Sequence, residues 1–130
     1  MNAENILNAA RGVLEQRGRC FNNYEYAGKV CVLGAMAVAA GQDPDLWVAL
    51  QELDEEEQAR KDAELVRAAR LFASVTVPRV ADADLEDLCV EVGRWHDGER
   101  LPGDVRPENS EVFEALAKAA SLAAQRGVAA

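Results

Sequence analysis

Apolar residues recur along residues 3–17 at the spacing of one helix face, and mostly polar residues fill the positions between them. The apolar set is Ile6, Ala9, Ala10, Val13 and Leu14. Asn2 stands where it can cap the first turn, and Gly18 follows the last turn. This pattern predicts an amphipathic helix over residues 3–17.

Residues 32–40 show no such alternation, because no polar side chain interrupts them. Cys31 precedes the run and Gly41 follows it. A helix without a polar face belongs in a protein interior, so we expect a buried central helix here. The run is too short for a membrane span of about 20 residues, so we expect no interaction with a membrane.

Four further stretches have helical periodicity. Their predicted bounds are 44–50, 55–73, 83–95 and 107–126. Start signals stand before or at three of these helices, namely Asp43-Pro44, Asp82 and Pro107. Residues 96–106 are rich in Gly and Pro and predict a loop.

Residues 19–31 separate the first two helices and have a different character. Asn22-Asn23 and Ala27-Gly28 are turn formers among strand-compatible residues, which predicts a short irregular hairpin or a structured loop. A two-stranded hairpin is marginal alone in water, so it must pack on the helices, through Phe21 and one of the tyrosines. The whole pattern predicts an all-α fold over residues 1–130: one compact domain of five to six helices, with a central apolar helix and a small hairpin-like loop.

Charge is unevenly distributed along the chain. Residues 1–41 hold three acidic and four basic residues, whereas residues 42–130 hold 20 acidic and 10 basic residues. The net charge of −9 argues against nucleic-acid binding, which needs a basic surface, and suits a basic partner. Three cysteines, an odd number, and an N-terminus without a signal-peptide pattern predict a cytoplasmic protein.

Cys31, His96 and Asp97 could act as a nucleophile, a base and a group that orients the base. Cys31 lies just before a predicted helix N-terminus, where the dipole would lower the pKa of a thiol. The interpretation that we favour treats Cys31 as a small buried residue and His96 as a cap on the last carbonyls of its helix.

The spacing of the cysteines and the histidine does not support a zinc site. Ten residues separate Cys20 from Cys31, six separate Cys89 from His96, and the chain has no C-x2-C pair. It also lacks the glycine-rich phosphate loops of nucleotide-binding proteins. We therefore predict no metal and no cofactor. A Cys20–Cys31 disulfide across the hairpin is geometrically possible.

Acidic residues gather around the starts of two predicted helices. We take as a candidate binding face Glu52, Asp54, Glu55, Glu56, Asp84 and Asp87. Such runs are usually solvated faces that complement the helix dipole, and a carboxylate site for a metal or for acid–base catalysis is the other interpretation.

Three motifs follow one another along the chain: R-G-R-C after the first helix, C-x-x-G-A at the central helix, and W-H-D before a final helix that Pro107 opens. Their order resembles a small domain family of unknown function, found in actinobacteria and their phages. The residues that match the family-type motif are Cys31, Gly34, Ala35, Trp95 and Asp97. His96 replaces the Asn of a W-N-D motif, so a Cys–His pair is not a family feature, which weakens the enzyme hypothesis.

The resemblance implies no activity, but it suggests a phage accessory protein. We therefore predict a non-enzymatic protein-interaction module that acts on a bacterial host protein in the host cytoplasm. Two alternatives stay open. One is a small Cys-dependent hydrolase or transferase that uses Cys31 and His96, and the other is a self-associating structural protein, which would form a homo-oligomer.

Overall fold

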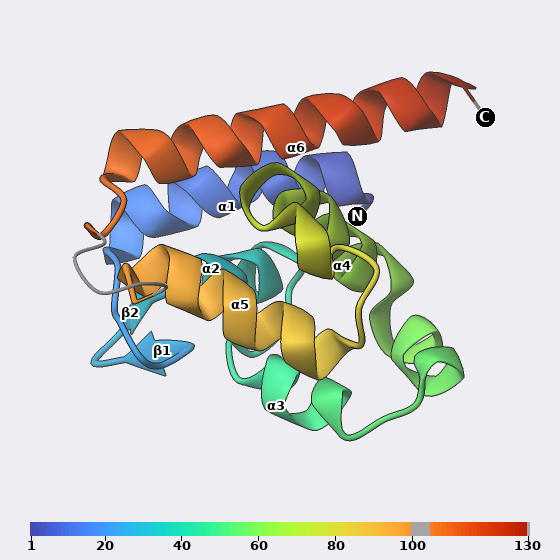
Figure 1. Cartoon of the computed structure of the whole chain (residues 1–130), viewed down its shortest axis with the longest axis horizontal. Coiled ribbons are helices and arrows are strands. Elements are labelled where there is room, and N and C mark those ends of the chain that lie inside the picture. Colours follow the sequence, from blue (N-terminus) through green and yellow to red (C-terminus); the bar gives the residue numbers. More distant parts are fainter. Residues whose placement is uncertain (100–104, 130) are drawn as a thin grey trace.

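Helices make up most of the protein, and Figure 1 shows their arrangement in a computed structural model that describes residues 1–99 and 105–129. The elements in chain order are α1 (Ala3–Arg17), β1 (Glu25–Tyr26), β2 (Lys29–Val30), α2 (Val32–Ala39), α3 (Leu46–Gln51), α4 (Glu55–Thr76), the short 3-10 helix η1 (Pro78–Val80), α5 (Leu85–Asp97) and α6 (Asn109–Ala129). The prediction of an all-α fold with a small hairpin is confirmed.

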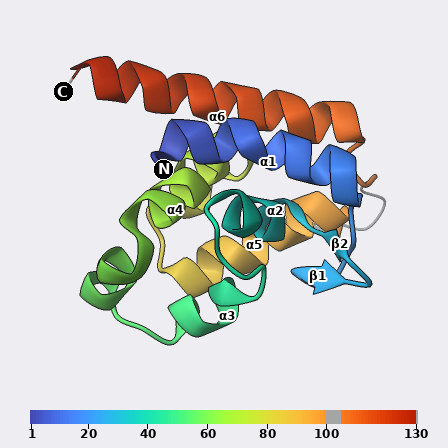
Figure 2. The same ribbon diagram turned by 180° about the vertical axis from the view of Figure 1, so that it is seen from behind.

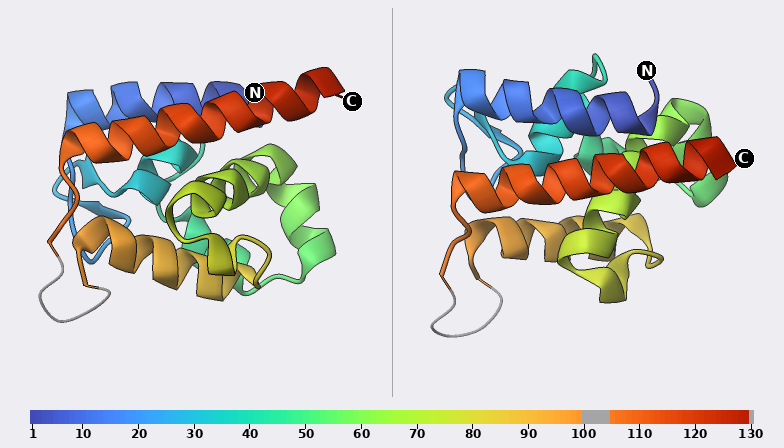
Figure 3. Two further views of the ribbon diagram at one scale, coloured as in Figure 1. Left: turned by 45° about the horizontal axis from the view of Figure 1, so that its top comes forward. Right: turned by 90° about the horizontal axis from the view of Figure 1, so that it is seen from above.

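The first and the last helix, α1 and α6, run side by side (Figures 1 and 2). The other helices and the hairpin lie on one side of this pair (Figure 3, left). α1 also packs on α2 and α4, and α6 packs on α4. The predicted bounds of the first helix are confirmed, and the Asn2 side chain caps it by accepting a hydrogen bond of 2.8 Å from the Asn5 N–H.

α2 lies at the centre of the core, as its apolar sequence predicts. Every residue from Val32 to Ala37 is buried. The indole Nε1 of Trp47 donates a hydrogen bond of 2.7 Å to the carbonyl of Leu33, and this bond attaches α3 to α2. The predicted buried central helix is therefore confirmed. None of the helices in residues 1–99 and 105–129 is long and apolar enough to cross a bilayer.

The hairpin of β1 and β2 packs against the start of α2. Its turn residues Ala27 and Gly28 both have positive φ, 53° and 85°, as a tight two-residue turn requires. Tyr24 is half-buried against the core, whereas Tyr26 is exposed. A Cβ at Gly34 would lie 2.2 Å from the Tyr24 carbonyl oxygen, so only glycine allows this close approach of the hairpin loop to α2.

Two helices begin later than predicted, because the residues that suggested their starts form turns instead. The Asp43 carboxylate accepts a hydrogen bond of 2.9 Å from the Asp45 N–H, and α3 begins only after Asp45. Asp82 lies in the hydrogen-bonded turn after η1, and Asp84 is the residue before α5. The predicted caps Asp43 and Asp82 are therefore wrong by two residues each.

The last helix also begins two residues after its predicted start. Pro107 is buried ahead of α6, and its carbonyl accepts a hydrogen bond from Arg19 instead of beginning the helix. Residues 100–104 of the predicted loop 96–106 lie outside the described residues.

α4 is longer than predicted and is bent. It continues to Thr76, and Asp62 has the non-helical angles φ −164° and ψ 88°. The Asp62 carboxylate accepts a hydrogen bond of 3.0 Å from the Leu65 N–H, so it caps the second half of the helix as it would cap a new one.

Candidate functional site

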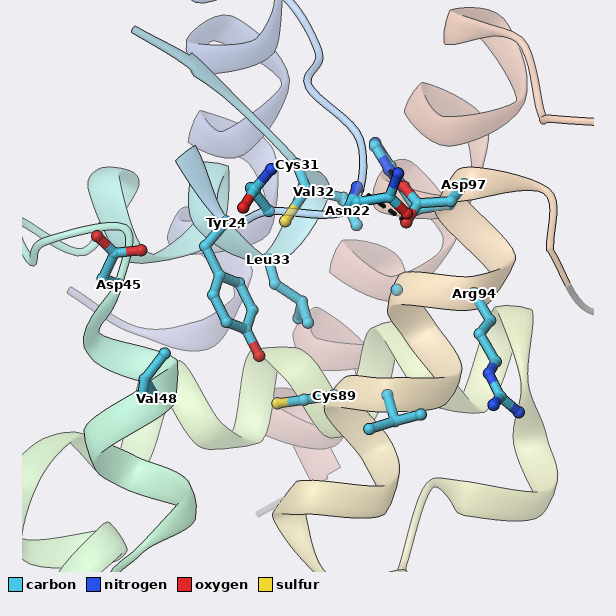
Figure 4. Close-up of a pocket in the computed structure, with 14 residues that line it drawn as sticks. Asn22, Tyr24, Cys31, Val32, Leu33, Asp45, Val48, Cys89, Arg94 and Asp97 are labelled. Carbon is cyan, nitrogen blue, oxygen red and sulfur yellow. Dashed lines mark hydrogen bonds and ion pairs between the residues drawn. The ribbon is translucent and has the colours of Figure 1, made fainter. Parts of the chain in front are cut away.

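A pocket of about 430 Å³ opens between the loop before β1, the start of α2, α3 and α5 (Figure 4). Cys31, His96 and Asp97 all line it, so the structure brings the three candidate catalytic residues to one cavity. The ring of Tyr24 points toward Cys89 inside the pocket (Figure 4). This pocket is therefore the candidate functional site.

The Cys31 thiol caps α2. Its Sγ accepts a hydrogen bond of 3.4 Å from the Gly34 N–H, and the side chain is buried. Burial raises the pKa of Cys31 to about 12, although hydrogen bonds from the helix start act in the opposite direction. The prediction of a lowered thiol pKa is wrong, because desolvation outweighs the helix terminus.

Both ring nitrogens of His96 have hydrogen-bond partners. Nε2 accepts a bond of 3.0 Å from Nε of Arg19, and because a guanidinium can only donate, the ring proton lies on Nδ1. Nδ1 in turn bonds an oxygen of Asp97 at 3.1 Å. The ring is fully buried, and this burial lowers the pKa of His96, which favours the neutral form.

The hydrogen bonds of His96 bear on two predictions, its role as a helix cap and its possible action as a base for Cys31. His96 does not cap the last carbonyls of α5, and that prediction is wrong, because its ring is turned toward Arg19 and Asp97. Among the described residues, no hydrogen bond joins His96 to Cys31. The two side chains share a pocket, but the proton-accepting nitrogen of His96 already has a donor.

The residues of the family-type motif lie at the start of α2 and in the second half of α5. Asp97 accepts a hydrogen bond of 3.1 Å from the Asn22 N–H, which joins the loop before β1 to the end of α5. Ala35 is fully buried next to Gly34. Trp95 packs edge-on against Phe72, with 5.6 Å between the ring centroids. In the structure, each of these residues makes a packing or loop-fixing contact.

A cluster around Arg19 was not recognised from the sequence. We call it the Arg19 cluster, and its members are Arg19, Phe21, His96, Asp97 and Arg106. The Arg19 guanidinium donates to the His96 carbonyl at 3.0 Å, to the Pro107 carbonyl at 2.7 Å and to Oδ1 of Asn109 at 3.1 Å. It therefore connects the end of α1 to the end of α5 and the start of α6.

The Phe21 ring completes this cluster. The Arg106 guanidinium lies 3.5 Å from the ring centroid, and the Arg19 guanidinium lies 5.1 Å from it. The His96 ring lies 5.3 Å away, centroid to centroid. The R-G-R-C motif contains Arg19 and was the available signal, but nothing in a single sequence relates it to residues some 80 positions away.

All three cysteines are buried free thiols, so the Cys20–Cys31 disulfide is not present. Cys20 donates a hydrogen bond of 3.3 Å to the Asn23 carbonyl. Burial raises the pKa of Cys89 to about 12. In the part of the chain that the structure describes, no three His, Cys, Asp or Glu side chains are grouped so that they could hold a metal ion.

The two acidic runs meet in space. Asp54 and Glu55 at the start of α4 line the same groove of about 310 Å³ as Asp84 and Glu86 at the start of α5. The remaining residues of the candidate binding face are exposed, namely Glu52, Glu56 and Asp87. Asp54 also caps α4 by accepting a hydrogen bond of 2.9 Å from the Glu57 N–H. The groove gathers negative charge that the linear sequence separates by some 30 residues.

Two valines at the edge of the pocket were not predicted as site residues. Val48 of α3 is 54% exposed and Val90 of α5 is 45% exposed, and both line the pocket. Each lies outside the apolar stripe of its helix, and this departure from helical periodicity was the signal that could have identified them.

Comparison with known proteins identifies the chain at the level of a family. A model described as "Family of unknown function (DUF6197)" matches residues 1–122, which include the hairpin, the pocket and most of α6. No curated protein and no solved structure matches the chain. The prediction of a family of unknown function is confirmed. The chain belongs to this family of unknown function, DUF6197.

Proposed function

We propose that the protein is a non-enzymatic protein-interaction module that binds a positively charged partner. The observation that carries the proposal is the acidic groove between the starts of α4 and α5. Its four acidic lining residues come from two segments, and all four are exposed. An exposed surface of one charge steers an oppositely charged partner and selects against others.

The chemistry of the pocket supports a binding role over catalysis. A Cys-dependent hydrolase or transferase needs a thiolate near neutral pH and a base that can accept its proton. The pKa of Cys31 is raised to about 12 by burial, and the acceptor nitrogen of His96 is bonded to Arg19. Both features oppose the enzyme alternative.

A bacterial host protein is the partner we propose, with this chain acting as a phage accessory protein. The support for this choice is the resemblance of the motifs to a family found in actinobacteria and their phages. A basic face on the host protein would complement the acidic groove.

Affinity capture tests the proposal. The purified protein is immobilised, incubated with an actinobacterial lysate, and the bound proteins are measured by quantitative mass spectrometry. An acid-neutralised variant combines Asp54→Asn, Glu55→Gln, Asp84→Asn and Glu86→Gln. The Asn at position 54 keeps a capping side chain, so α4 retains its start.

A matched control removes four exposed acids elsewhere, by Glu15→Gln, Glu25→Gln, Glu108→Gln and Glu114→Gln. Their surface ion pairs contribute little to stability. We expect a partner that the wild type and the control both capture and the acid-neutralised variant loses. Equal capture by all three proteins would contradict the proposal, and so would a partner lost by folded Cys31→Ser and His96→Gln variants alone.

A further inference from the structure

The pocket lined by Cys31 and His96 has an apolar rim that packing within the protein does not explain. Val48 and Val90 lie on different helices, α3 and α5, yet both line the same cavity and both leave about half of their surface in water. Exposed aliphatic side chains are common singly, but two that line the same pocket make its edge apolar, as is typical of ligand-binding pockets.

The interior of the pocket is suited to an uncharged group. Leu33 and Tyr24 line it, and the Tyr24 hydroxyl already accepts a hydrogen bond of 2.8 Å from Gln51. The two thiols that line the pocket, Cys31 and Cys89, remain protonated at neutral pH because burial raises the pKa of each to about 12. The part of the wall formed by Leu33, Tyr24 and the two thiols therefore carries no charge, and the Asp97 carboxylate, which also lines the pocket, is held by hydrogen bonds from the Asn22 N–H and from Nδ1 of His96.

Gly93 of α5 leaves part of this space empty. It lines the pocket, and a Cβ added to it would meet nothing within 4 Å. A larger residue there would extend into open space without displacing the protein's own atoms. Gly93 is thus the position at which the pocket can be filled while the rest of the fold is kept.

Acidic side chains flank the two valines. Asp45 and Glu52 lie one turn before and after Val48, while Glu86 and Asp87 lie one turn before Val90, and all four are exposed. The basic residue on this wall, Arg94, points away from the pocket in Figure 4 and pairs with Glu91 at 3.3 Å.

We propose that this pocket receives one apolar side chain from a positively charged segment of the protein partner. The partner segment carries lysine or arginine on either side of this apolar residue, and these basic side chains face the acidic residues beside Val48 and Val90. The inference rests on the proposed interaction function and names the feature of the partner that is recognised. An apolar side chain seated in a pocket with charges around it is a common arrangement of protein interfaces.

Peptide titrations followed by amide NMR test the inference directly. The probes are three unlabelled, capped pentapeptides: Lys-Lys-Leu-Lys-Lys, the same peptide with Gly in place of Leu, and Glu-Glu-Leu-Glu-Glu. We expect the first peptide to shift the amide signals of Val90 and Gly93. We expect the other two to bind at least tenfold more weakly.

Two matched variants connect the binding to the pocket. Gly93→Leu fills the cavity, and Gly12→Leu makes the same change on α1, where a Cβ also meets nothing within 4 Å. We expect Gly93→Leu to bind the first peptide at least tenfold more weakly, and Gly12→Leu to bind it like the wild type. Unchanged binding by Gly93→Leu, or shifts confined to other parts of the protein, would overturn the inference.

Three further outcomes relate this inference to the proposed function. If the acid-neutralised variant loses its captured partner while Gly93→Leu retains it, the pocket inference fails and the interaction function stands. If both variants retain the partner, both proposals fail. If the wild type is a dimer in size-exclusion chromatography and Gly93→Leu is a monomer, the occupant is a second copy of this chain, which also overturns the inference.

Discussion

Replacing His96 by glutamine isolates the effect of one buried proton site on stability. The glutamine carbonyl can accept the hydrogen bond from Arg19, but it does not titrate. His96 is the single histidine of the chain, so no other histidine contributes to pH dependence between pH 5 and 7. The two proteins therefore differ in one titrating group in that range.

The sign and size of the effect follow from the lowered pKa of His96. Above the unfolded-state value of about 6.5, both states hold a neutral ring and no stability is lost. Below it, the unfolded state takes up a proton that the folded state refuses, so the free energy of unfolding falls by about 1.4 kcal/mol per pH unit. The loss continues until the pH reaches the lowered pKa of the folded protein.

Urea unfolding at pH 7.5, 6.5, 5.5 and 5.0 measures this difference. At pH 7.5 we expect His96→Gln to be less stable than the wild type by about 1–2 kcal/mol, because the bond to Asp97 is lost. We expect this gap to narrow as the pH falls below about 6.5, because only the wild type loses stability through the protonation of its unfolded state. If the free energies of unfolding of the two proteins differ by the same amount at every pH from 7.5 to 5.0, the reasoning is refuted.

Three further outcomes are expected from the packing around the same region. Gly34→Ala should lower the free energy of unfolding by more than about 2 kcal/mol, because the added methyl group would lie 2.2 Å from a backbone oxygen. Gly12→Ala should raise the free energy of unfolding by about 0.5–1 kcal/mol, because a Cβ there meets nothing within 4 Å. Urea unfolding that ranks the two variants in the opposite order would contradict this reasoning. Arg19→Lys should lower the free energy of unfolding by about 2 kcal/mol in the same assay, because an ammonium group cannot reach all the acceptors that the planar guanidinium bonds. An unchanged free energy of unfolding would show that the Arg19 cluster does not stabilise the fold. Cys31 and Cys89 should react with Ellman's reagent at pH 8 only slowly in the folded protein and fully in guanidinium chloride, because burial raises the pKa of both thiols. Fast reaction of the folded protein would contradict this prediction, because it would show that these thiols are accessible thiolates.

Helices whose patterns are local could be predicted from the sequence. The first helix has its cap, its apolar stripe and its terminal glycine within 17 consecutive positions, and its bounds were predicted correctly. The central helix was equally clear, because an unbroken apolar run has one stable place in a small protein. The predicted starts of α3 and α5 were wrong by two residues each. Aspartate favours turns as well as helix caps, and a single sequence does not distinguish these two roles.

The candidate site could be predicted only in part. The sequence suggested Cys31, His96 and Asp97 as a possible set but did not predict whether they lie close together, and neither their shared pocket nor their hydrogen bonds were foreseen. The deciding partner of His96 is Arg19, which is 77 positions away in the chain. The direction of the Cys31 pKa shift also depended on burial, which outweighed the helix terminus that was visible in the sequence.

The pairing of α1 with α6 has a consequence for how the chain folds during synthesis. α1 is synthesised before the other helices of this domain and α6 after them, so the contacts between α1 and α6 join segments that are far apart in the sequence. Until α6 emerges, one apolar side of α1 and α4 stays in contact with water, and the nascent protein is most prone to aggregate at that stage. A chain that terminates before α6 should therefore be recovered in the insoluble fraction or be degraded, even though it contains the complete pocket.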